Sequence, residues 1–198
     1  MSIINFCFKK FIDLFFVLFI LIFFFPIFLL IPILIIIIDG SPIMFTQVRA
    51  GKDGREFKLY KFKTISNSNQ KIKITKLGRF LRITRIDEFP QIFNILKGEI
   101  SLVGPRPLYT KYIKLYDEEQ IKRLTVTPGI TGWAQINGEN NISWKKKFEL
   151  DVWYIRNYNI FLDLKIIFLT LIFFIKKIIF YNKNQNNKII EDEFNGKN

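Results

Sequence analysis

Residues 14–38, LFFVLFILIFFFPIFLLIPILIIII, form an unbroken apolar run that decides which folds this chain can adopt. As one straight helix these 25 residues would be about 37 Å long, against roughly 30 Å of hydrocarbon in a bilayer. A secretory signal peptide would have an apolar region of only about 7–15 residues, followed by small residues at a cleavage site. Here Asp39-Gly40-Ser41 closes the run. The sequence therefore predicts a membrane helix rather than a signal peptide.

Prolines and flanking charges indicate how this helix enters the membrane. Pro26 lies at the middle of the run, and the 12 residues on either side of it reach about 18 Å, roughly half a bilayer. An interior proline kinks a helix because it lacks a backbone N–H. Lys9 and Lys10 precede the run and further Lys and Arg residues follow it, so the positive-inside rule places both flanks in the cytoplasm. We expect a re-entrant helix. A spanning helix is the alternative, since spanning helices also contain prolines.

The balance of charge and apolar content limits the class of protein. The formal net charge is +13, while 49% of the residues are hydrophobic. Soluble proteins that bind nucleic acid are usually polar throughout, so this pairing favours a membrane surface, where each Lys or Arg gains about 1 kcal/mol from anionic headgroups. Histidine is absent and Cys7 is the only cysteine. This excludes a Ser-His-Asp triad, a His-ligated zinc site and an intramolecular disulfide, and leaves carboxylates, Lys and Tyr for chemistry.

After the membrane run the pattern changes to short strands and helices. Residues 43–48 and 56–64 are β-prone and flank Ala50-Gly-Lys-Asp-Gly54, which predicts a small hairpin. Residues 66–76 are polar and predict a mobile loop. Further helices are expected over residues 77–84, 88–96, 108–124 and 143–157, with loops rich in proline or glycine over 99–107 and 128–138.

The C-terminal part contains a second apolar segment, residues 160–181. It carries Asp163 and several lysines, and its uncharged core is too short to span a bilayer. We expect an interfacial amphipathic helix whose lysines extend to the headgroups. A second transmembrane helix is the alternative. The residues beyond 182 are polar and predict a disordered tail. The expected fold is α+β and mainly helical.

The segment LGRFLRITRIDEFP, residues 77–90, is the richest in groups that could do chemistry. Asp87 is a good helix N-cap, which would put Pro90 in the first turn, where its missing N–H costs nothing. The partial positive charge of a helix N-terminus suits both a carboxylate and an incoming phosphate. Glu88 would point about 100° away from Asp87, so one carboxylate could attack while the other binds a metal. For these residues alone, ordinary helix capping is the simpler interpretation.

Four cations and one amide are candidates for substrate binding. Arg82 lies in the same basic segment, and Arg106 stands between two prolines that restrict its backbone and aim its guanidinium. Lys61 and Lys63 fall on one face of a predicted strand because strand side chains alternate. Gln135 lies in a loop that also offers an aromatic ring, which suits a nucleobase or a sugar. Each has a structural interpretation as well. Arg82 would lie on a solvated helix face and Arg106 in a rigid turn, the two lysines would lie on a strand edge, and Gln135 would only pack.

Taken in order, these segments resemble the monotopic phosphoglycosyl transferases, the bacterial sugar transferase family. The shared motifs are Lys9-Lys10-x-x-Asp13, the central proline, Gln47-Val-Arg-Ala-Gly51, Tyr60-Lys-Phe-Lys-Thr64, Leu77-Gly-Arg-x-Leu-Arg82, Asp87-Glu-x-Pro-Gln91, Asn94-x-Leu-Lys-Gly98, Ser101-Leu-Val-Gly-Pro-Arg-Pro107, Pro128-Gly-Ile-Thr-Gly-Trp-Ala-Gln135 and Leu162-Asp-Leu-Lys165. The chain is most similar to the small bacillosamine-type members that start protein glycosylation, a likeness that includes Phe194-Asn-Gly-Lys-Asn198. It departs from the family at Phe25, where Ser usually precedes the proline, and at Ile65, which replaces a usual Met.

The resemblance implies a two-step reaction at the cytoplasmic face of the inner membrane, with Mg²⁺ as cofactor. Asp87 matches the family nucleophile, which attacks the β-phosphorus of a UDP-sugar, expels UMP and holds the sugar phosphate until undecaprenyl phosphate takes it. UDP-N,N′-diacetylbacillosamine is the candidate donor, and the product would begin glycoconjugate assembly. Glu88 matches the metal ligand. The positions that match phosphate-binding residues are Lys61, Lys63, Arg82 and Arg106.

The resemblance also implies an organisation and a set of partners. Residues 1–39 would form the re-entrant membrane helix, 40–181 a cytoplasmic catalytic domain lying on the membrane, and 182–198 a polar tail. The residues expected to set the membrane helix are Lys9, Lys10, Asp13 and Pro26. Expected partners are the UDP-sugar, undecaprenyl phosphate, membrane lipid and a second copy of the chain in a homodimer, with no nucleic acid. The rival interpretation is a non-catalytic, membrane-anchored basic module that binds nucleic acid or anionic lipid.

Overall fold

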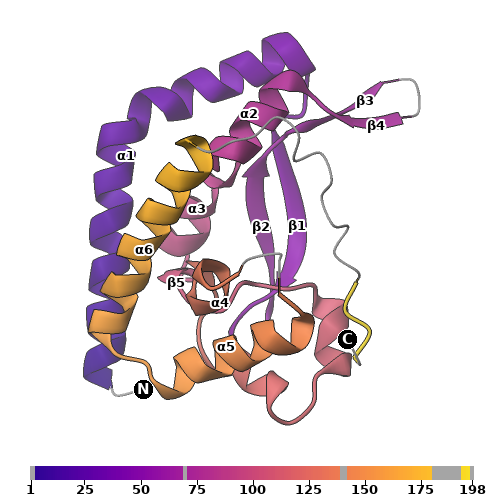
Figure 1. The fold of residues 1–198 in the computed structure, drawn as a ribbon. Coiled ribbons are helices and arrows are strands. Elements are labelled where there is room, and N and C mark those ends of the chain that lie inside the picture. The colour runs from indigo at the N-terminus through magenta and orange to yellow at the C-terminus, as the bar shows by residue number, and fades with distance from the viewer. Residues whose placement is uncertain (1–2, 69–70, 139–141, 180–192, 197–198) are drawn as a thin grey trace.

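The computed structural model describes residues 3–68, 71–138, 142–179 and 193–196 (Figure 1). Within them the chain is mainly helical with small two-stranded sheets, so the prediction of a mainly helical α+β fold is confirmed. A bent N-terminal helix forms one side of the molecule, and the sheets and shorter helices fill the angle of its bend (Figure 1).

Helix α1 (Ile3–Asp39) contains the whole apolar run. It bends part-way along, so that its two arms run in different directions (Figure 1). Pro26 and Pro32 lie inside it, and each removes an N–H that an earlier carbonyl would otherwise accept. Of the described helices, α1 alone is long and apolar enough to cross a membrane, and only 11% of that stretch is buried in the protein. Since the core helix of a soluble protein would be mostly buried, we expect α1 to contact lipid.

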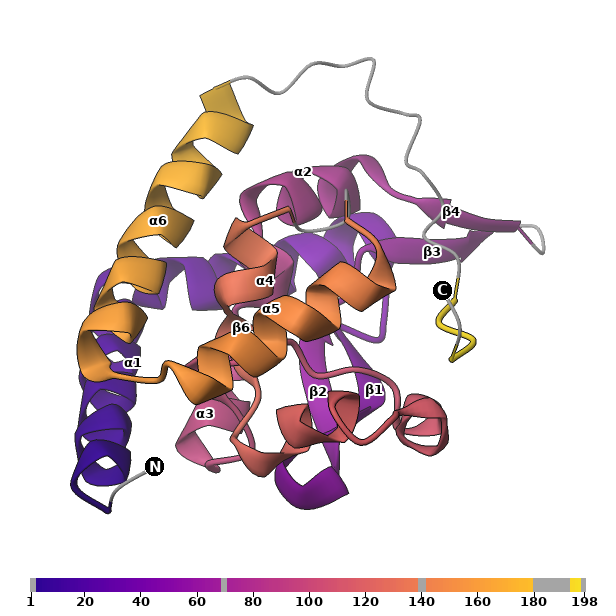
Figure 2. The same ribbon diagram turned by 60° about the horizontal axis from the view of Figure 1, so that its bottom comes forward.

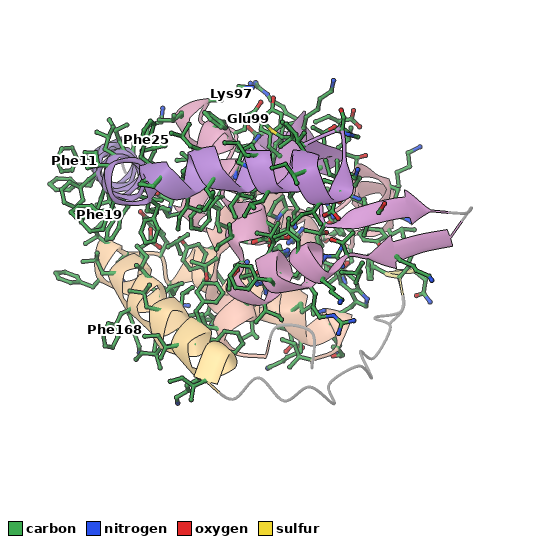
Figure 3. All side chains as sticks on the ribbon, turned by 90° about the horizontal axis from the view of Figure 1, so that it is seen from above. Phe11, Phe19, Phe25, Lys97, Glu99 and Phe168 are labelled. Carbon is green, nitrogen blue, oxygen red and sulfur yellow. The ribbon has the colours of Figure 1, made fainter. Side chains whose placement is uncertain are left out.

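The two faces of α1 have different surroundings. Large apolar side chains project away from the molecule on one face, among them Phe11, Phe19 and Phe25 (Figure 3). On the other face Val17 and Ile35 are fully buried. They pack into two apolar clusters shared with the hairpin and the short helices behind it. One face of α1 is therefore part of the protein core, and the other is left for an apolar solvent.

The first predicted hairpin is confirmed, and a second one replaces the predicted loop. Strands β1 (Met44–Ala50) and β2 (Glu56–Phe62) pair antiparallel around a 3₁₀ turn, η1 (Lys52–Gly54). The loop predicted at 66–76 is wrong, because β3 (Ile65–Ser68) pairs antiparallel with β4 (Lys71–Ile74). The missed signal is the alternation of Lys and Ile in KIKI, which suits a strand.

The helix predicted at 77–84 is confirmed as α2 (Lys76–Thr84), whose N-terminus is capped by the Thr75 hydroxyl. The helix predicted at 88–96 is wrong at its start. Arg85 adopts the left-handed conformation at φ 57°, and a 3₁₀ turn, η2 (Ile86–Glu88), follows it. Helix α3 (Gln91–Leu96) begins only after Pro90. Asp87 therefore lies inside the turn and is not a helix N-cap.

The predicted helix at 108–124 is two shorter 3₁₀ segments, η3 (Thr110–Leu115) and η4 (Gln120–Thr125). Between them the Asp117 carboxylate accepts the backbone N–H groups of Glu119 and Gln120. Such local bonds compete with a continuous helix. The amphipathic spacing alone therefore predicted the wrong structure.

The predicted loops hold short regular elements. Strand β5 (Ser101–Val103) pairs in parallel with β6 (Gly129–Thr131), and α4 (Trp133–Ile136) follows. Helix α5 (Trp144–Arg156) confirms the prediction at 143–157, and Ser143 caps it. The first turns of helix α6 (Ile160–Ile179) lie next to the N-terminal arm of α1 in two views, and in Figure 2 the rest of α6 extends away from that arm (Figures 1 and 2). Phe168 of α6 projects outward (Figure 3).

The tail predicted as disordered at 182–198 is wrong at residues 193–196, where Phe194 is buried in an aromatic cluster. The rest of that tail lies outside the described residues.

A buried ion pair joins α1 to the rest of the protein. The Lys9 ammonium donates to the Asp163 carboxylate at 2.6 Å and to the Val103 carbonyl at 2.8 Å. Tyr154 donates to the other oxygen of Asp163 at 2.6 Å. One turn further along α1, Asp13 accepts the backbone N–H of Leu102 at 3.0 Å. Lys9 and Asp13, two of the residues expected to set the membrane helix, therefore both point into the protein.

We predict that Lys9→Met destabilises the protein by about 3–5 kcal/mol, because it leaves the Asp163 charge buried without its partner. Thermal unfolding in detergent, followed by circular dichroism, measures this. The matched control is Lys10→Met at the neighbouring exposed position, which should change stability by less than about 0.5 kcal/mol. Equal effects of the two substitutions would contradict a structural role for the Lys9 pair.

Candidate active site

A cleft of about 660 Å³ lies between the first hairpin, the η2 turn and the segments that carry η3, α4 and α5. Its volume is that of a pocket for a small molecule. The ionisable and amide side chains that line it are Gln47, Arg49, Lys61, Arg82, Arg85, Asp87, Glu88, Arg106, Arg123, Gln135, Lys147, Asp151 and Glu193. The cleft is therefore strongly cationic, with a few carboxylates at defined places.

Two adjacent carboxylates lie side by side in the η2 turn at the wall of this cleft. Asp87 and Glu88 are each only 7% exposed. The left-handed Arg85 and the tight turn after it present both side chains to the cleft, which a regular helix would not do for adjacent residues. The Oδ1 atom of Asp87 is buried and has no hydrogen-bond partner among the described atoms. Such a group is rare in a folded protein and marks a candidate reactive group.

Glu88, unlike Asp87, has a carboxylate oxygen with several cationic partners. Its Oε1 atom accepts from the Lys61 ammonium at 2.8 Å, from the Arg106 guanidinium at 3.1 Å and from the Arg85 guanidinium at 3.4 Å. The three cations come from β2, from the loop after β5 and from the turn after α2. One carboxylate therefore gathers three positive charges at the cleft wall.

The two carboxylates have opposite pKa shifts. Burial opposes the ionisation of Glu88, but the three neighbouring cations outweigh it and hold the pKa of Glu88 well below its ordinary value. For Asp87, burial first and the negative charge of Glu88 second raise the pKa above its ordinary value, although nearby cations oppose this. Neighbouring carboxylates with divergent pKa values are typical of a site where the two have different roles.

The structure brings most of the predicted substrate-binding residues to the cleft. Lys61, Arg82, Arg106 and Gln135 line it, together with both carboxylates. Arg82 donates to the Thr64 hydroxyl at 2.8 Å, and both polar atoms of the Gln135 side chain are buried without a described partner.

Lys63 lies elsewhere. Its ammonium donates to the carbonyls of Asp39, Gly40 and Ser41 at 2.9, 3.1 and 3.3 Å. Strand β2 ends at Phe62, so the alternation that placed Lys61 and Lys63 on one face does not continue. Lys63 closes the C-terminal end of α1, where free carbonyls attract a cation.

Several residues of the cleft were not among the predicted site residues. Arg49 lies over the Tyr109 ring at 3.7 Å, and the Gln47 amide donates to the Tyr109 hydroxyl at 2.9 Å. Arg123 forms a buried pair with Asp151 at 2.9 Å and donates to the Arg106 carbonyl at 2.7 Å. The Arg123 pair thus holds the Pro-Arg-Pro loop in place. Gln47 and Arg49 stand in one of the motifs that carry the family resemblance, whereas Arg123 and Asp151 stand in none of them.

The carboxylates at the cleft wall are potential ligands for Mg²⁺. In the described residues no group of three or more His, Cys, Asp or Glu side chains gathers at one point. In phosphoryl transfer, however, Mg²⁺ is usually held by one or two carboxylates together with the phosphates of the substrate. Glu88 supplies one such carboxylate at the cleft wall, directly beside Asp87. The residues present fit Mg²⁺ held jointly with a bound phosphate.

Comparison with known proteins identifies relatives of this chain. The model of the bacterial sugar transferase family matches residues 4–177. The uncharacterized sugar transferase EpsL of Bacillus subtilis is 50% identical over 165 residues, covering 79% of this chain and 80% of that protein. A UDP-glucose:undecaprenyl-phosphate glucose-1-phosphate transferase of Klebsiella pneumoniae is 41% identical over 185 residues, covering 84% of this chain but 40% of that protein.

The Aeromonas hydrophila protein named UDP-N-acetylgalactosamine-undecaprenyl-phosphate N-acetylgalactosaminephosphotransferase is 36% identical over 162 residues, covering 74% of this chain and 38% of that protein. This chain therefore spans well under half the length of several of the relatives that it matches. The family match covers most of the chain, including α1 from residue 4 onward, both carboxylates and every cleft residue named above except Glu193. The chain belongs to the bacterial sugar transferase family.

Proposed function

We propose that this protein transfers a sugar-1-phosphate from a UDP-sugar to undecaprenyl phosphate and releases UMP. The observation that carries the proposal is the pair of buried carboxylates in a cationic cleft, one with an unpartnered oxygen and the other joined to three cations. The names of the Klebsiella and Aeromonas relatives support the reaction class, since both are undecaprenyl-phosphate sugar-phosphate transferases.

The proposed first step is attack by an Asp87 carboxylate oxygen on the sugar-bearing β-phosphorus of the donor. A bond forms between this oxygen and the phosphorus, and the bond from the phosphorus to the bridging oxygen breaks. UMP leaves with the bridging oxygen and its electron pair. In the second step an oxygen of undecaprenyl phosphate attacks the same phosphorus and displaces the Asp87 carboxylate. The product is a sugar linked to undecaprenyl diphosphate.

The cleft residues have distinct roles in this reaction. Lys61, Arg82 and Arg106 would bind the diphosphate oxygens and stabilise the charge that develops during transfer. Glu88, ionised because of its cation partners, would hold Mg²⁺ with the bound phosphate. When bound, Mg²⁺ supplies further positive charge to the transferred phosphate. Asp87 needs no neighbouring base, because a carboxylate attacks as the anion.

The identity of the sugar is a further proposal. UDP-N,N′-diacetylbacillosamine is our candidate donor, on the resemblance of the C-terminal Phe194-Asn-Gly-Lys-Asn198 to the bacillosamine-type enzymes. Relatives named for glucose and N-acetylgalactosamine show that the family uses several donors. A panel of UDP-sugars is therefore the appropriate test.

We further propose that α1 is re-entrant, and that the cleft lies on the cytoplasmic face of the inner membrane. The bend of α1, its outward apolar face and the cations near both of its ends support this placement (Figures 1 and 3). A non-catalytic basic module that binds lipid or nucleic acid gives no reason for a buried, unpartnered carboxylate beside an ion cluster.

Purified protein with Mg²⁺ and undecaprenyl phosphate should release UMP from at least one UDP-sugar, and Asp87→Asn should reduce the rate by at least about 1,000-fold, since an amide is not a nucleophile here. Wild-type protein and donor alone should give a covalent adduct in intact-protein mass spectra, and the variant should not. Asp117→Asn, at an exposed capping carboxylate, is the matched control and should keep normal activity. Normal turnover by Asp87→Asn would refute the covalent mechanism.

Lys61→Ala and Lys63→Ala should have different effects on activity, although the two lysines are only two residues apart. Loss of a charge-assisted bond at Lys61 should lower kcat/KM for the donor about 10- to 100-fold. Lys63→Ala should change it by no more than about twofold, because its ammonium lies on the end of α1. Steady-state UMP release measures both. An equal loss for the two variants would place Lys63 at the substrate and contradict the geometry.

The placement of α1 predicts that both of its ends react with a membrane-impermeant maleimide from the same side. Cys7 is the only native cysteine, and Ser41→Cys adds one just after the helix. In inverted inner-membrane vesicles, which expose the cytoplasmic face, both should be labelled. Labelling from opposite sides would establish a spanning helix.

A further inference from the structure

The C-terminal residues 193–196 lie against the same cleft, although they are far from Asp87 in sequence. Figures 1 and 2 draw them in yellow, well away from the end of α6. Glu193 belongs to the cleft lining, and its carboxylate lies 2.5 Å from the Lys111 ammonium. Gly196 lies beside Leu115 of η3. The end of the chain is therefore part of the wall around the cleft.

Phe194 fixes this segment in place. It is only 3% exposed. Its ring centroid lies 4.9 Å from that of Phe148, 5.6 Å from that of Trp144 and 5.7 Å from that of Tyr112. Aromatic rings at these separations attract one another beyond simple burial. All three partners line the cleft, while Phe194 backs them from behind and so sets the position of their rings.

The aromatic side chains of the cleft come from other segments than the carboxylates, and two cleft cations lie over them: Arg49 over the Tyr109 ring at 3.7 Å and Lys147 over the Trp144 ring at 4.6 Å. Tyr109, Tyr112 and Trp144 come from η3 with its N-cap residue and from the start of α5. The carboxylates and their cations come from the hairpin, the η2 turn and the loop after β5. A nucleotide sugar has the same division, since its base is flat and apolar while its diphosphate is charged. Aromatic side chains bind nucleobases by stacking, and a carboxylate is a common acceptor for ribose hydroxyls.

We propose that the C-terminal segment completes a nucleoside subsite, in which the half-buried Trp144 ring, held in place by Phe194 and by the buried Tyr112 and Phe148, stacks on the base and Glu193 accepts a hydrogen bond from a ribose hydroxyl. The inference rests on the proposed function, because it takes the ligand to be a nucleoside diphosphate sugar. Phe194 is a positioning residue that acts through Tyr112, Trp144 and Phe148. Glu193 contacts the ligand directly.

The test measures the binding of two fragments to the full-length protein in nanodiscs with Mg²⁺. UMP carries the nucleoside, and inorganic pyrophosphate carries only the charge. Phe194→Ala should weaken UMP binding roughly 10-fold, in the range of one lost stacking contact, and leave pyrophosphate binding unchanged. Unchanged pyrophosphate binding also reports that the cleft of the variant is folded. Glu118→Ala, at an exposed position between η3 and η4, is the control and should affect neither fragment.

Glu193→Gln separates the ribose contact from the aromatic contact. It should weaken the binding of UMP but not that of 2′,3′-dideoxy-UMP, which lacks the hydroxyls. In turnover, both variants should raise the KM for the donor, with kcat and the KM for undecaprenyl phosphate unchanged. A merely structural role of the tail would instead lower kcat and weaken both fragments together.

The outcomes distinguish the two proposals. If Phe194→Ala binds UMP as the wild type does, or loses UMP and pyrophosphate equally, the nucleoside subsite is refuted while the transferase reaction stands. If activity rises in Phe194→Ala, the tail blocks the cleft and the subsite is likewise refuted. If the wild type binds neither fragment and releases no UMP, the proposed function fails and the subsite fails with it.

Discussion

The charge of Glu88 is the constraint on which the arrangement of the cleft depends. A buried carboxylate without compensation is destabilising by several kcal/mol. Lys61, Arg85 and Arg106 compensate it at a single oxygen atom. These cations come from segments that are not adjacent in sequence, so satisfying one charge brings the hairpin, the η2 turn and the loop after β5 together. The shape of the cleft and the place of Asp87 within it follow from that ion cluster.

Helix α1 is joined to the same framework at both ends. Near its start, the Lys9–Asp163 pair attaches α1 to α6 and β5. At its end, Lys63 binds the last carbonyls, and the Thr75 hydroxyl donates to the Asp39 carboxylate at 2.9 Å. Lys63 directly follows β2, which carries Lys61, and Thr75 caps α2 before the η2 turn. In the proposed reaction the acceptor is a lipid, so a membrane helix fixed to the cleft-bearing segments keeps the cleft at the depth of the acceptor phosphate.

The fold and the site could be predicted from the sequence where the pattern that specifies them lies within a few neighbouring residues. The apolar run, the first hairpin and α5 follow from patterns of a few residues, and Asp87 and Glu88 follow from a motif. The predicted helix at 108–124 failed because Asp117 caps a turn that amphipathic spacing does not reveal. Asp87 was mistaken for an N-cap because Arg85 adopts a positive φ, which composition does not predict. The buried pair of Lys9 with Asp163 was not predicted because the two residues lie far apart along the chain. The docking of Phe194 was missed for the same reason.

The missing hydrogen-bond partner of Asp87 Oδ1 favours the proposed attack on phosphorus. A buried acceptor without a partner costs about 1–3 kcal/mol, so the resting carboxylate is poorly stabilised where it lies. When Asp87 bonds to phosphorus, the carboxylate becomes an acyl phosphate, which is a mixed anhydride, and loses its charge. The negative charge then resides on the phosphoryl oxygens, which the cations that line the cleft can reach. A histidine base would add nothing in either step, since the nucleophile is a carboxylate and a phosphate monoester with a second pKa of about 6 is largely ionised at neutral pH. The absence of histidine from the chain is thus compatible with a site whose catalytic power comes from placing positive charge where the phosphate charge accumulates.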